Sequence, residues 1–178
     1  MVAKIRTTMR ARLGSERGAE LIEMMVVTPL LLFLFAAIFD FAVLFRGWET
    51  VTNAAREGAR VASLPAFTAD ADVVTRVEQY MEATGLTDGS NTSCTLGTVS
   101  GTTCSEPSSP GDCSVCVKAQ SIPTPGGGTF SARSVTVVYK QQLPTLSSVS
   151  PLFGGADFAN VNVGSTSLMR TEAAAATP

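Results

Sequence analysis

The sequence predicts an α+β protein built on one long N-terminal helix, part of which is apolar enough to cross a membrane. Three observations predict this fold class. An apolar run covers residues 24–45, a second helical pattern begins near residue 70, and three stretches of alternating apolar residues occupy the C-terminal half. Strands joined by short breaks form a small antiparallel meander of about three strands, and the two helices can cover one of its faces.

A basic leader precedes the apolar run. Residues 1–18 carry five Lys or Arg residues and one acid, whereas the whole chain has a net charge of −2. A basic flank stays on the cytoplasmic side of a membrane, so we expect a single-pass protein of the inner (cytoplasmic) membrane with the chain after Phe45 outside. The overall charge predicts no nucleic-acid partner.

The apolar run Met24–Phe45 is about 22 residues long, and as a helix it covers about 33 Å, enough to cross a hydrocarbon core. A cleaved secretory signal is the alternative, but its apolar part is shorter and an A-x-A site follows it closely. The nearest such site, Ala69–Ala71, lies far downstream. Pro29 is expected to kink or loosen the helix, and Trp48 marks the outer interface.

The helix is predicted to continue outside the membrane to residue 63, so the helical part is 19–63 and the outer domain 64–178. Small residues after Glu49 recur at helical spacing and allow close packing, and Pro65 ends the helix. A second helix is predicted from Asp70 to Thr84, capped by Thr68 or Asp70 and ended by Gly85. Its buried stripe consists of Val73, Val74, Val77, Tyr80 and Met81.

The rest of the outer domain is predicted to be a tied-down loop followed by strands. Residues 86–112 are rich in Gly, Ser, Thr and Pro and are expected to form the loop. The tail from Thr171 is expected to stay disordered. The predicted strands are Ser114–Ala119, Phe130–Gln142 and Asn160–Arg170, separated by breaks at Pro123–Gly128 and around Pro151–Gly155.

Four cysteines lie on the predicted outer side, where an oxidising compartment favours disulfides: Cys94, Cys104, Cys113 and Cys116. The C-x-x-C pair Cys113 and Cys116 falls in a strand and not at a helix start, where a reactive thiolate would be stabilised. A zinc site would need all four thiolates at an irregular spacing. We therefore expect two structural disulfides, with three connectivities open.

The residue types argue against catalysis. The chain has no His, the commonest general base and metal ligand. It also lacks G-x-S-x-G, S-x-x-K and paired-acid motifs, and the glycines 126–128 fall between strands, where they form a turn and not a phosphate loop. The expectation is a non-enzymatic protein that needs no cofactor and no metal.

One carboxylate, Glu23, precedes the apolar run, and another, Asp40, lies within it. Glu23 lies five residues after Gly18. It is either an acid that a helix N-terminus favours, which is the role expected for Glu20, or a carboxylate that is buried in a bundle of helices and needs a cation there. Cleavage between Gly18 and Ala19 would create such a cation on Ala19. Asp40, near the outer end, either reaches the interface near Arg46 or faces a neighbouring protein helix.

The segment from Gly18 to Ser63 resembles the N-terminal half of TadE-like pilus-assembly proteins. The resemblance rests on Gly18, Glu23, Pro29 in the apolar run and the stretch Asn53–Arg60. The strand Val135–Tyr139 and the closing residues 167–172 are similar to the way that family ends. Met24 stands where the family often has Phe, and it remains apolar.

The resemblance implies a minor pilin or assembly subunit of a tight-adherence (Flp-type) type IV pilus. It implies removal of residues 1–18 by a prepilin peptidase and a role for Glu23 in assembly. The implied partners are that peptidase, other pilin-like subunits, the secretion ATPase with its membrane platform, and membrane lipid. A membrane-anchored scaffold outside any filament and a type II secretion pseudopilin remain alternatives.

Overall fold

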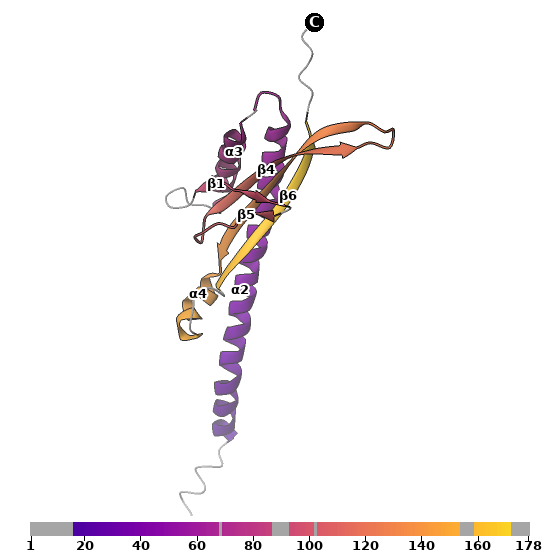
Figure 1. The fold of residues 1–178 in the computed structure, drawn as a ribbon. Coiled ribbons are helices and arrows are strands. Elements are labelled where there is room, and N and C mark those ends of the chain that lie inside the picture. Colours follow the sequence, from indigo (N-terminus) through magenta and orange to yellow (C-terminus); the bar gives the residue numbers. More distant parts are fainter. Residues whose placement is uncertain (1–15, 68, 87–92, 102, 154–158, 172–178) are drawn as a thin grey trace, which may run out of the picture. The chain divides into compact units, whose positions relative to one another are not determined.

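The computed structural model describes residues 16–67, 69–86, 93–101, 103–153 and 159–171. The chain forms two units, and the division falls between Phe39 and Asp40. The long helix α2, Glu16–Ser63, contains residues of both units and includes Pro29 (Figure 1). Residues 1–15 of the predicted leader lie outside the described residues, as do Thr68 and the tail from residue 172.

The first unit presents apolar side chains to its surroundings all along α2. Every large apolar side chain from Leu21 to Phe39 is exposed. The candidate membrane span begins at Glu20, and its most apolar window has a mean hydropathy of 2.4 with none of its residues buried. A helix that is apolar all round and unburied fits a single membrane crossing.

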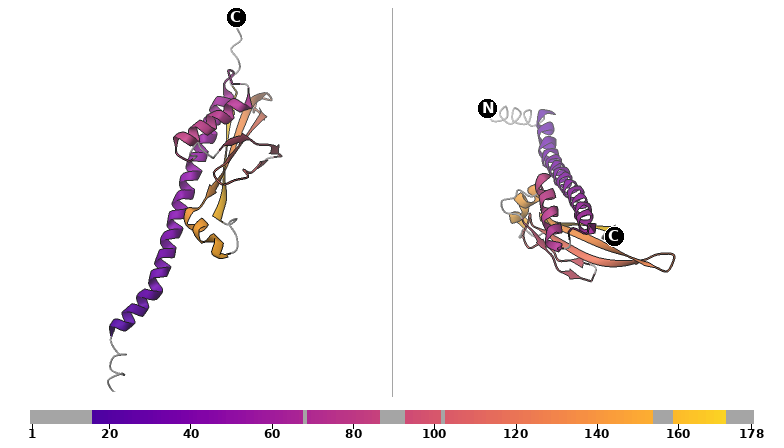
Figure 2. Two further views of the ribbon diagram at one scale, coloured as in Figure 1. Left: turned by 90° about the vertical axis from the view of Figure 1, so that its left-hand side faces the viewer. Right: turned by 90° about the horizontal axis from the view of Figure 1, so that it is seen from above.

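The second unit packs α2, from Asp40 onward, and helix α3, Asp70–Ala83, on one face of a sheet (Figure 2). The strand order is β1-β4-β5-β6, in which the last three strands are antiparallel and β1 is parallel to β4. Their bounds are β1 Cys94–Leu96, β4 Cys113–Pro123, β5 Thr129–Gln142 and β6 Asn160–Arg170. The predicted α+β fold is confirmed, and β1 adds a strand inside the stretch expected to be a loop.

The same stretch also contains a small hairpin, formed by β2 (Val99–Ser100) and β3 (Thr103–Cys104). Between β5 and β6, where only a break was expected, lie a short helix α4, Pro144–Val149, and the 3-10 turn η1, Ser150–Phe153. Pro144 occupies the start of α4, a position that suits its fixed φ and missing N–H.

The core lies between the two helices and the sheet, and small residues of α2 make it possible. Gly58 shows how close the packing is, because a Cβ there would stand 2.8 Å from Val77 Cγ2 and 3.1 Å from Val135 Cγ1. The predicted small-residue face is therefore the face that packs on α3 and β5. Fully buried members include Val51, Ala54, Ala55, Ala59, Val73, Val77, Met81, Val115, Val135 and Val137.

The two ends of α3 differ in how well the sequence predicted them. Asp70 does not cap the helix but forms an ion pair with Arg133 of β5, so that cap was predicted wrongly. The other end follows the prediction. Gly85 has a φ of +68°, and the Leu86 N–H bonds to the Met81 carbonyl at 3.1 Å, which closes the last turn.

Candidate functional site

The predicted cleavage site lies in α2, near the start of the described residues. The described part of α2 begins at Glu16, two residues before Gly18. A Cβ on Gly18 would meet nothing within 4 Å.

Glu23 is exposed one helical turn beyond Ala19. Residues four apart on a helix share a face, with about 5–6 Å between their Cβ atoms. Glu20 and Glu23, three apart, are neighbours of like charge on the same surface. A new amino group at Ala19 would thus lie within reach of Glu23 and would offset a local excess of negative charge.

Glu57 of α2 pairs with Arg60 on the same helix and with Arg76 on α3. Its oxygens accept hydrogen bonds from Arg60 Nε at 2.9 Å, from Arg60 Nη2 at 2.8 Å and from Arg76 Nε at 3.0 Å. The hydrogen bonds of Arg60, aided by Arg76, outweigh partial burial and lower the Glu57 pKa from 4.5 to about 2. The stretch Asn53–Arg60 therefore supplies an ion-pair link, together with the close approach at Gly58.

Asp40 stands where the second unit begins, and it holds α4. Its Oδ1 accepts the Thr145 N–H at 3.0 Å and its Oδ2 accepts the Leu146 N–H at 2.9 Å. These backbone partners in the same chain were not predicted from the sequence, and Arg46 donates to the Thr84 carbonyl at 3.0 Å. The first amides of α4 lack acceptors within their helix, and its N-cap residue supplies none.

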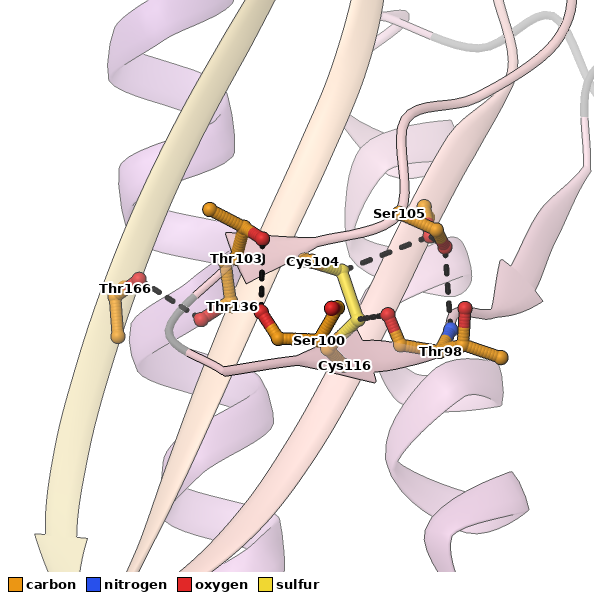
Figure 3. Close-up of a disulfide and its surroundings, with 9 residues drawn as sticks. Thr98, Ser100, Thr103, Cys104, Ser105, Cys116, Thr136 and Thr166 are labelled. Atoms are coloured by element: carbon orange, nitrogen blue, oxygen red, sulfur yellow. Dashed lines mark hydrogen bonds between the residues drawn. A yellow bond between two sulfur atoms is a disulfide. The ribbon is translucent and has the colours of Figure 1, made fainter.

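The four cysteines form two disulfides, Cys94–Cys113 and Cys104–Cys116. The sequence predicted two disulfides and left their connectivity open. Side chains alternate across a strand, so Cys113 and Cys116, three apart on β4, point to opposite faces of the sheet. Cys113 lies in the helix-covered core, while Cys116 lies under the β2–β3 hairpin (Figure 3). The C-x-x-C pair cannot close on itself within this strand.

Comparison with protein-family models finds a similarity over part of the chain. Residues 18–60 match the family model described as TadE-like protein. The match begins at Gly18 and stops shortly before α2 ends at Ser63, so it covers the helix and not the sheet. No curated protein and no solved structure shows a significant match to the chain.

Proposed function

We propose that this chain, which carries a TadE-like segment at residues 18–60, is a minor pilin or assembly subunit of a tight-adherence type IV pilus. The family match relates the protein to pilus assembly. The proposal of a pilin subunit rests on one observation, which is that the two parts of α2 have different surroundings. Its side chains are exposed and apolar from Leu21 to Phe39, whereas Val51, Ala54 and Ala55 are fully buried in the core of the second unit.

A helix divided in this way can change its surroundings without changing its fold. In the membrane, lipid covers the exposed part; in a filament, the same surface packs against helices of other pilin-like subunits. The buried part stays fixed to the sheet throughout. The proposed partners are therefore other pilin-like subunits, delivered by the secretion ATPase and its membrane platform.

Processing supplies the charge that assembly needs. A prepilin peptidase cuts between Gly18 and Ala19 and leaves a free amino group on Ala19. When helices bundle away from water, the Glu23 carboxylate needs a cation, since an unpaired charge in apolar surroundings is costly. The Ala19 amine of the same or a neighbouring subunit, one turn away along the helix surface, provides it.

The experiment that tests this proposal compares two charge-removing variants on the same helix surface. Glu23→Gln keeps the size and hydrogen bonding of the side chain, and Glu20→Gln, three residues earlier, is the matched control. Both variants are expressed in cells that make the pilus, cleavage is confirmed by mass spectrometry of the membrane-extracted protein, and surface pili and co-purifying pilin are measured.

We expect Glu23→Gln to be cleaved and inserted in the membrane normally but to lose most of its incorporation, while Glu20→Gln retains it. Normal piliation with a cleaved Glu23→Gln protein would refute the pairing role. Protein that keeps residues 1–18 in cells with normal pili would instead favour a scaffold that never enters a filament.

A further inference from the structure

We propose that α4, η1 and the first residues of β6 rest in the outer interface of the membrane, so that the second unit is seated on lipid. The inference goes beyond pilus assembly and requires only that α2 crosses a bilayer. It begins from the length of the uncharged part of α2.

That uncharged part is too short for a bilayer. Between Glu23 and Asp40, residues 24–39 carry no charge, which gives about 24 Å of helix at about 1.5 Å per residue. A hydrocarbon core is about 30 Å thick and takes about 20 residues. A span that starts after Glu23 therefore extends about four residues past Phe39, and Asp40 lies about 5 Å inside the outer edge of the hydrocarbon.

The fold satisfies Asp40 internally at this depth. The residue is 9% exposed, and each carboxylate oxygen accepts a backbone N–H of α4. A carboxylate near lipid is costly unless its hydrogen bonds are met by protein groups. Because these hydrogen bonds are 3.0 and 2.9 Å long, Thr145 and Leu146 must lie at the depth of Asp40. The start of α4 is thus at the membrane boundary.

The composition of this segment suits that place. Residues 143–153 contain no charged side chain, α4 has no buried residue, and Val149 is 38% exposed. The serine hydroxyls are directed to the backbone: Ser147 and Ser148 each donate to the Pro144 carbonyl at 2.9 Å. Hydroxyls bonded within their own helix leave little polar surface that needs water.

An apolar groove opens on the same stretch of α2. It has a volume of about 390 Å³, and its wall on α2 consists of Phe41, Leu44, Phe45 and Trp48, facing residues 161–164 of β6. None of these residues is charged. Trp48 is 50% exposed, and Trp is enriched at membrane interfaces. Because this wall continues along the same helix as the membrane span, outer-leaflet acyl chains are the occupant to which we assign the groove.

Fluorescence quenching tests the proposal, because Trp48 is the single Trp of the chain. The full chain is placed in phosphatidylcholine vesicles whose acyl chains carry bromine either near the headgroup or near the chain end. The native protein reports on the groove. Trp48→Phe combined with Val149→Trp reports on α4. Two further double variants with Trp48→Phe are controls: Phe33→Trp within the span, and Ser121→Trp on the exposed β4–β5 hairpin.

We expect headgroup-proximal bromine to quench Trp48 and the Val149→Trp probe several-fold more strongly than the Ser121→Trp probe, and chain-end bromine to quench the Phe33→Trp probe most. Equal, weak quenching at positions 149 and 121, with strong quenching at 33, would overturn the proposal while leaving the pilus function intact. No quenching at 33 would remove the membrane span itself. Quenching of Trp48 that vanishes as the protein-to-lipid ratio rises would show that a second copy, and not lipid, fills the groove.

Discussion

Glu57 should make the second unit sensitive to acid, and the substitution Glu57→Gln isolates that effect. The pKa of Glu57 falls from 4.5 to about 2 on folding, chiefly through Arg60 and then Arg76. A lowered pKa stabilises the folded state above pH about 4.5, and this contribution is lost as the pH falls toward 2. The ion pairs of Glu57 with Arg60 in α2 and with Arg76 of α3 are the physical source.

The size of the effect follows from the pKa and the exposure of the partners. At about 1.4 kcal/mol per pH unit, the change from 4.5 to about 2 corresponds to at most about 3 kcal/mol. The Arg60 and Arg76 side chains are 53% and 46% exposed, so solvent screens the pairs and we expect about 1–2 kcal/mol. For a domain of this size, that free energy lowers Tm by about 3–8 °C.

Calorimetry of the full chain in detergent measures the effect at pH 7 and at pH 2. Glu57→Gln should lower Tm at pH 7 and differ little from the native protein at pH 2. Glu49→Gln, an exposed acid on the same helix, is the control and should change Tm little at either pH. If Glu57→Gln shows the same loss of stability on acidification as the native protein, the ion pairs do not account for the acid sensitivity.

Three further predictions concern processing, disulfides and packing. Gly18→Val should leave residues 1–18 attached while Gly14→Val permits their removal, as intact-mass measurement of membrane-extracted protein would show; a native chain that begins at Met1 or Val2 would contradict the processing model. A thiol-alkylating reagent should label none of the four cysteines before reduction and all four after it, and stoichiometric zinc in the purified protein would count against the disulfides. Gly58→Leu should destabilise the second unit by more than about 2 kcal/mol, because even a Cβ meets Val77 at 2.8 Å, whereas Arg56→Leu on the exposed face should cost under about 1 kcal/mol by calorimetry.

The helices and strands whose apolar residues recur at a regular spacing were the ones that could be predicted from the sequence. The long helix, α3 and the three antiparallel strands have apolar spacings that need no knowledge of partners, and Gly85 ends α3 for a reason visible in the sequence. The start of α3 could not be predicted in this way, since Asp70 is drawn to Arg133, sixty-three positions along the chain.

The short elements depended on contacts that a local pattern does not contain. β1 has three residues and exists because it pairs with β4, and α4 has six residues whose first amides need Asp40, more than one hundred positions earlier. Pro144 was the one local signal for α4. The exposed positions of Gly18 and Glu23 agree with a site for processing and assembly, but their roles stay predictions, because neither role is performed within an isolated chain.

The placement of Cys113 and Cys116 on opposite faces of β4 has a consequence for the order in which the protein matures. Four thiols can pair in three ways, but once β4 has formed, the two sulfurs of the C-x-x-C pair are separated by the strand itself. Cys94 lies opposite Cys113 in the β1–β4 register, while the β2–β3 hairpin brings Cys104 to Cys116. The sheet thus acts as a template for oxidation, and a chain in which Cys113 bonds to Cys116 before β4 forms would hold a pairing that this sheet cannot contain.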